Sequence, residues 1–85
     1  MADIDAAQIR AARGLLEWSQ RDLVEKTGLS LTTIRRMEDS RIGTARSSAG
    51  NVATVRKTLE SAGIEFIPEN GGGPGVRLRD RKTNG

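Results

Sequence analysis

The sequence predicts a mainly α fold, in which four helices form a helix-turn-helix domain followed by a short C-terminal β-hairpin and a disordered tail. Three observations support this class. Apolar residues recur at helical spacing in four segments. Two of the shorter segments are separated by Gly28-Leu29-Ser30, which is typical of the turn in a helix-turn-helix unit. Near the end of the chain, two strand-like segments flank a run of turn-forming residues. At 85 residues, the chain has room for one domain.

The first helix is expected over Ala6–Glu17. Asp5 followed three residues later by Gln8 fits a capping box, in which the carboxylate accepts free N–H groups and the glutamine contacts the capping residue in return. The apolar residues that follow share one helical face: Ile9, Ala12 and Leu16.

The second and third helices form the helix-turn-helix unit. The second is expected over Gln20–Thr27, with Ser19 as its N-cap and Gly28 at its end, where a left-handed conformation costs glycine least. The third is expected over Leu31–Asp39 and is capped by Ser30. The residues expected to face the core from these helices and their turn are Leu23, Val24, Thr27, Leu29, Ile34 and Met37.

The segment after the third helix is small and polar, so Arg41–Gly50 is predicted to be a loop. A fourth helix is expected over Asn51–Ala62, where Val52, Val55 and Leu59 form an apolar stripe, and Gly63 ends it.

The C-terminal part of the chain predicts a hairpin. Ile64–Ile67 is β-branched and aromatic, Val76–Arg79 alternates apolar and basic residues, and Pro68–Gly75 between them consists mostly of turn formers. An isolated hairpin is marginally stable in water, so this one should pack on the helices or pair with a second chain. The expected division is a helical domain, the hairpin and a disordered tail: residues 1–63, 64–79 and 80–85.

The composition restricts the possible functions. The chain has no cysteine and no histidine, so thiolate metal sites, disulfides and the commonest general base are excluded. We expect no enzymatic activity, no cofactor and no metal site. No apolar run approaches the roughly 18 residues of a membrane span, and Met1–Asp5 is acidic, unlike the start of a signal peptide. We expect a cytoplasmic protein without a membrane partner.

The charge distribution is uneven. The net charge of +3 and a pI near 10.2 make a nucleic-acid partner plausible. However, residues 1–40 carry six basic and seven acidic groups, whereas residues 41–85 carry eight basic and four acidic groups. The basic excess therefore lies after the helix-turn-helix unit.

The segment Ser19–Glu38 resembles the Xre/Cro-type helix-turn-helix family of phage repressors and small bacterial regulators. Gln20 opens the second helix, Leu23 lies at a core position and Gly28 lies in the turn. In this family an arginine of the first helix pairs with a glutamate at the end of the third, which implies an ion pair between Arg13 and Glu38.

The resemblance covers about residues 9–79. The stretches Leu59–Ile67 and Gly71–Arg79 look like the tail of short alphaproteobacterial members of the family. The resemblance implies contacts with DNA at the starts of the second and third helices and along the third: Gln20, Ser30, Leu31, Thr32, Arg35 and Arg36. The first two would contact phosphates. Arginine can bind guanine O6 and N7, and a threonine methyl group or leucine can contact a thymine methyl group.

Two functions follow from these observations. The first is a DNA-binding transcriptional regulator that recognises a double-stranded operator, expected to be a homodimer because dimers place two recognition helices in successive major grooves. The alternative is an antiactivator, a protein-binding module that sequesters another transcriptional regulator, such as a quorum-sensing activator. The negative balance of residues 1–40 and the apolar Leu31 at the tip of the third helix favour this alternative.

Overall fold

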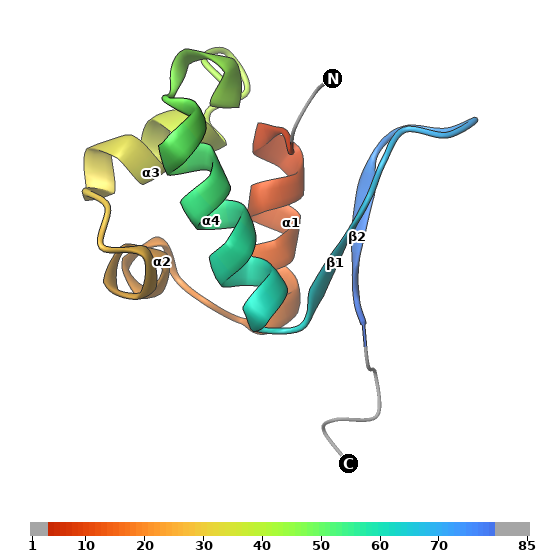
Figure 1. The fold of residues 1–85 in the computed structure, drawn as a ribbon, viewed down its shortest axis with the longest axis horizontal. Helices are drawn as coiled ribbons and strands as arrows, with labels where there is room; N and C mark the ends of the chain where they lie inside the picture. Colours follow the sequence, from red (N-terminus) through yellow and green to blue (C-terminus); the bar gives the residue numbers. More distant parts are fainter. Residues whose placement is uncertain (1–3, 80–85) are drawn as a thin grey trace.

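The computed structural model describes residues 4–79, and the predicted disordered tail at residues 80–85 lies outside them. Four α-helices and one short 3-10 helix precede a two-stranded antiparallel hairpin (Figure 1), which is the predicted fold class. In chain order the elements are α1 (Ala6–Leu16), α2 (Gln20–Thr27), α3 (Leu31–Glu38), η1 (Thr44–Arg46), α4 (Ala49–Ser61), β1 (Ile64–Ile67) and β2 (Gly75–Leu78).

The predicted caps determine where three of the helices begin. Asp5 and Gln8 form the expected capping box at α1, and Ser19 forms one at α2 with Asp22. The Ser30 hydroxyl accepts from the Thr33 N–H at 3.1 Å and starts α3. Each cap satisfies an N–H group that has no partner inside its helix.

Two boundaries after α3 differ from the prediction. The segment predicted as a loop contains η1, which follows Gly43 with a left-handed φ of 76°. Helix α4 begins at Ala49, two residues earlier than predicted, because the Ser48 hydroxyl accepts from the Asn51 N–H and acts as the N-cap. The helix boundaries predicted at Glu17, Asp39 and Ala62 each extend one residue too far, since these residues are the C-caps.

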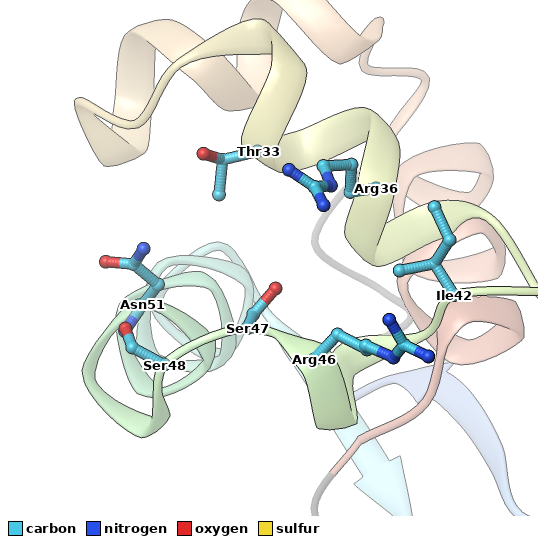
Figure 2. A pocket seen from close by; sticks show the side chains of 7 residues that line it. All are labelled: Thr33, Arg36, Ile42, Arg46, Ser47, Ser48 and Asn51. Carbon is cyan, nitrogen blue, oxygen red and sulfur yellow. The ribbon is translucent and has the colours of Figure 1, made fainter.

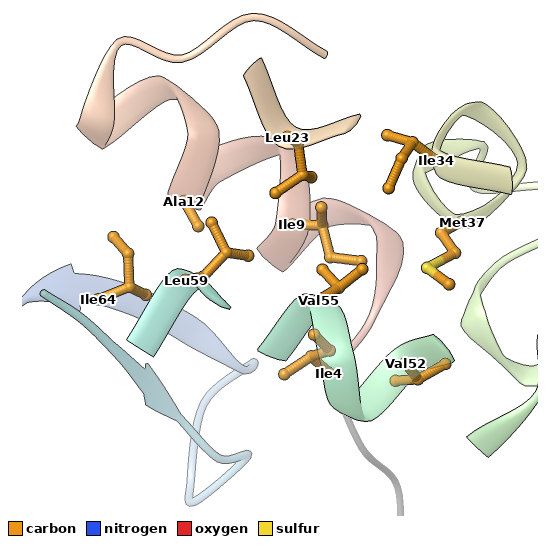
Figure 3. Close-up of a cluster of buried hydrophobic side chains, with 10 residues drawn as sticks. All are labelled: Ile4, Ile9, Ala12, Leu23, Ile34, Met37, Val52, Val55, Leu59 and Ile64. Atoms are coloured by element: carbon orange, nitrogen blue, oxygen red, sulfur yellow. The ribbon is translucent and has the colours of Figure 1, made fainter. Parts of the chain in front are cut away.

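The core lies between the four helices and the first strand (Figure 3). Its largest fully buried side chains come from α1, α2, α3, α4 and β1: Ile9, Leu23, Ile34, Met37, Val55, Leu59 and Ile64. The core positions predicted for these helices are therefore confirmed, except that Val24, Thr27 and Leu29 are half-buried at its margin. Trp18 packs at the same margin, and its ring lies 5.0 Å from the Lys26 ammonium.

The two strands of the hairpin pair with each other, and the hairpin packs on the helices. β1 contacts α4 and β2 contacts α1. In the antiparallel register, Ile64 lies opposite Leu78 and Phe66 opposite Val76, so these four side chains share the face that packs against the core. The strand predicted over Val76–Arg79 is shifted by one residue to Gly75–Leu78, because Gly75 pairs with Ile67.

Helices α2 and α3 form the helix-turn-helix unit. Gly28 takes the left-handed conformation at the end of α2, with φ of 78°, as its position in the turn predicts. The Thr27 hydroxyl donates to the Leu23 carbonyl and accepts from the Leu29 N–H, which holds the turn between the helices. Among residues 4–79, no helix combines the length and the apolar character that crossing a membrane requires.

Candidate nucleic-acid interface

Helix α3 has one face in the core and one in solvent. Ile34, Met37 and Glu38 are buried, whereas Thr32, Arg35 and Arg36 are exposed. Leu31, which was grouped with the exposed residues in the prediction, is half-buried. The solvent face of α3 is therefore polar and basic, with leucine only partly accessible at its N-terminal end.

A buried ion pair holds α3 against α1. The Arg13 guanidinium binds both carboxylate oxygens of Glu38, at 2.7 Å through Nε and 2.8 Å through Nη2. The Glu38 side chain is 3% exposed. The hydrogen bond to Glu38 raises the pKa of Arg13 above its ordinary value. This is the pair that the family resemblance implied, and it fixes the orientation of α3 because a buried carboxylate requires its partner.

The two predicted phosphate contacts, Gln20 and Ser30, also have structural hydrogen bonds. Gln20 Nε2 donates to Glu38 Oε1 at 3.0 Å, which connects α2 to the buried ion pair. Ser30 Oγ accepts from the Thr33 N–H and donates to the Thr33 hydroxyl at 3.0 Å. One amide hydrogen of Gln20 remains available for another acceptor. Both residues lie at the N-terminal ends of their helices, on the side where backbone N–H groups favour anions.

A polar cavity of about 220 Å³ extends the solvent face of α3 toward the start of α4 (Figure 2). Thr33 and Arg36 line it from α3, and Ser47, Ser48 and Asn51 line it from the opposite side. The remaining lining residues are Ile42 and Arg46. The sequence prediction included only Arg36 among these residues. Ile42, Arg46, Ser47 and Ser48 come from the segment interpreted as a loop, and Asn51 comes from the first turn of α4. Thr33 lies on α3 itself and is half-buried.

The arginine side chains fall into two groups. Within the described part of the chain, four of them make no hydrogen bond or ion pair: Arg21, Arg35, Arg36 and Arg46. Three of these belong to the solvent face of α3 or to the adjacent cavity. An unpaired guanidinium has five N–H donors that are free for phosphate oxygens or base edges.

The negative balance of residues 1–40 does not extend to this surface. Asp5 and Asp22 cap helices, Glu38 is buried against Arg13, and Asp39 binds Arg41 at 3.0 Å. The only acidic residue within α3 is the buried Glu38. Four of the acidic groups in this part of the chain are therefore held by helix caps or ion pairs, and the solvent face of α3 carries two arginines and no acidic residue.

Comparison with family models, with curated proteins and with solved structures finds no match. The Xre/Cro resemblance of Ser19–Glu38 therefore stays a prediction from the sequence. The helix-turn-helix geometry and the basic surface described above are properties of this chain itself.

Proposed function

We propose that this chain is a DNA-binding transcriptional regulator that places α3 in the major groove of a double-stranded operator and acts as a homodimer. The observation that carries the proposal is the set of unpaired arginines on the solvent face of α3 and beside the adjacent cavity: Arg35, Arg36 and Arg46. Arginine recognises guanine and phosphate with its planar fork of donors. Arg35 and Arg36 lie on the solvent face of the helix that would enter the groove, and Arg46 lines the cavity beside it.

The contacts divide into two kinds. Thr32, Arg35 and Arg36 lie on the solvent face of α3 and would reach base edges or the flanking backbone. The cavity residues Arg46 and Ser47, with the N-terminus of α4, would contact phosphates, because short polar groups and free backbone N–H groups suit phosphate oxygens. The buried pair of Arg13 and Glu38 keeps α3 in a fixed orientation against α1.

The proposal is tested by fluorescence anisotropy with labelled duplex DNA from the region upstream of the chain's own gene, at two salt concentrations. Binding through phosphates should weaken steeply as salt rises. Arg36→Ala should cost about 1 to 3 kcal/mol of binding free energy. Lys57→Ala removes the same charge from an exposed site on α4 and should have little effect. Equal effects of the two substitutions would contradict recognition by α3, and so would the absence of salt-dependent binding to this DNA and to duplexes selected from a random pool.

The antiactivator function remains the second candidate, and Leu31 is the observation that favours it. Its side chain is partly accessible at the N-terminal end of α3, beside a polar surface. A partner protein that inserts an apolar group there would bind with little salt dependence. Leu31→Asp should then abolish capture of the partner while Arg36→Ala leaves it intact. The reverse result would favour DNA binding.

A further inference from the structure

Helix α1 exposes an apolar stripe next to the hairpin. Ala7, Ala11 and Leu15 follow one another at a spacing of four residues, and all three are exposed. Leu15 is 42% exposed and is the large apolar residue that the described part of the chain leaves most accessible. Gly14 lies on the same side, with open space where a Cβ would be. A glycine inside a helix costs about 1 kcal/mol relative to alanine, and no contact within the chain requires it.

The position of Gln8 relates this stripe to the hairpin. Its side-chain amide donates to the carbonyl of Gly75 at 3.0 Å, so this side of α1 faces the strands. Ala11 is three residues and Leu15 seven residues after Gln8, which places both beside it on the helix surface. Because β2 is the strand that contacts α1, the exposed stripe borders the outer edge of β2.

Within residues 4–79, the outer edge of β2 has hydrogen-bonding groups without partners. The Arg79 N–H donates to the Gly63 carbonyl at 2.7 Å, which makes Gly63 and Arg79 a hydrogen-bonded pair. Hydrogen-bonded and non-hydrogen-bonded pairs alternate along an antiparallel ladder. The backbone groups of Val76 and Leu78 therefore point away from β1, and neither residue has a hydrogen bond outside the hairpin among residues 4–79.

We propose that the edge of β2 and the α1 stripe together bind a second copy of this chain, with β2 pairing antiparallel to the β2 of its partner. A two-fold axis at Arg77 sets Val76 of each copy opposite Leu78 of the other. In this register, the N–H and C=O groups of Val76 in each copy form hydrogen bonds with those of Leu78 in the other copy. On the core-facing side it continues the apolar row of Phe66 and Val76 into Leu78 and Ile64 of the partner's sheet.

The charges at the proposed axis and the area of the proposed interface both favour a second copy of the chain as the binding partner. Arg77 is held by Glu65 on its own hairpin at 3.1 Å, so the two arginines that meet at the two-fold axis are each compensated by an acidic group of their own copy. A strand ladder alone is too small for a stable interface, which buries about 1,000 Å² or more. The adjacent stripe adds apolar area, and its alanines and glycine allow two α1 helices to approach closely. Val76 and Leu78 are only half-buried in the single chain, as expected for an unfinished sheet.

This dimer is the one that the proposed DNA-binding function uses. The experiment that tests it measures self-association in the absence of DNA. Sedimentation equilibrium of the full chain, from micromolar to millimolar concentration, should give a monomer–dimer equilibrium. Ala11→Glu introduces a charge into the stripe and should weaken self-association by about tenfold or more. Ala53→Glu is the matched control, because Ala53 is an exposed alanine on α4 and its substitution should leave the association unchanged.

Amide exchange of the unmodified chain provides a second measurement that does not depend on the folding of a variant. The N–H groups of Val76 and Leu78 should become protected as the concentration rises, whereas the N–H of Glu69 at the tip of the hairpin should not. A chain that stays monomeric at millimolar concentration would overturn the proposal, as would a dimer weakened by Ala53→Glu and not by Ala11→Glu. A monomer that binds DNA would leave the proposed function intact, and a dimer that ignores DNA would leave this interface intact.

Discussion

Arginine side chains on α1 and on the hairpin make hydrogen bonds or ion pairs, whereas among the described residues those on the solvent face of α3 and in η1 do not. Arg13 binds Glu38, and Arg77 binds Glu65. Arg35, Arg36 and Arg46 have no partner within the described part of the chain. In Figure 1 the hairpin lies on the far side of α1 from α2 and α3. The same residue type thus stabilises the fold on one side and remains available for a ligand on the other.

This difference shows why the net charge of a segment is a poor guide to the charge of the candidate interface. The sum over residues 1–40 is negative, but Asp5 and Asp22 take part in helix caps and Glu38 and Asp39 in ion pairs. The groups that a ligand would meet are the ones left unpaired after folding.

The largest effect is expected from breaking the buried ion pair. Glu38→Ala leaves the guanidinium of Arg13 partly buried without its partner and also removes the acceptor of Gln20. The free energy of unfolding should fall by about 3 to 5 kcal/mol, measured by urea denaturation. Asp39→Ala breaks an exposed pair one residue later and should change stability far less. Equal losses from the two variants would show that burial does not distinguish these pairs.

On the binding side, Arg46→Ala tests whether the cavity contacts phosphates. Its loss should weaken binding by a similar factor for every duplex sequence and reduce the slope of log affinity against log salt by about 1. The measurement is anisotropy over a salt series. Arg41→Ala is the control, since Arg41 is already paired with Asp39. An unchanged slope for Arg46→Ala would remove the cavity from the interface.

The attachment of the hairpin depends on Gln8. Its amide oxygen accepts from the Asp5 N–H at 2.9 Å, and its amide nitrogen donates to the strands. Gln8→Ala loses both contacts at a buried site, so stability should fall by about 1 to 2 kcal/mol. Gln8→Glu keeps an acceptor for the Asp5 N–H but cannot donate to the Gly75 carbonyl. A lower thermal midpoint for this variant would therefore measure the contribution of the contact with the strands, separately from that of the helix cap. If Gln8→Glu were as stable as the unmodified chain, the contact with the strands would contribute nothing.

The smallest effect concerns acid pH. The hydrogen bond from Arg77, followed by the charge of the same group, lowers the pKa of Glu65 below its ordinary value. A carboxyl group whose pKa is lower in the folded state contributes stability above its unfolded pKa and loses it as the pH falls through the folded pKa. Between about pH 5 and pH 3, thermal melting of the unmodified chain should therefore decline slightly more than that of Glu65→Gln. Parallel curves would mean that the exposed pair has no net effect.

Much of the helical fold could be predicted because its signals are local. Asp5, Ser19 and Ser30 each start a helix at the expected residue, and Gly28 ends α2. The first turn of α4 was missed because Ser48 is followed by Ala49 and Gly50, which show no helical periodicity.

The candidate site could be predicted only in part, because its two halves come from different segments. Thr32, Arg35 and Arg36 lie on one helix, so periodicity identifies their common face. The proximity of Arg36 to Arg46 depends on how η1 packs against α3, which no spacing in the sequence reveals. The second role of Gln8 is hidden for the same reason, since its cap is local but Gly75 is 67 residues away.

The most direct test of the contrast is one NMR experiment on the labelled chain, in which chemical shifts are mapped once during dilution and once during titration with operator DNA. Dilution should move the signals of α1 residues 7–15 and of Val76 and Leu78. DNA should move those of residues 30–36 and 46–51, and less so at high salt. Two separate sets of signals are the predicted result. If dilution and DNA moved the same signals, the division of the molecule into a self-association side and a DNA-binding side would be wrong.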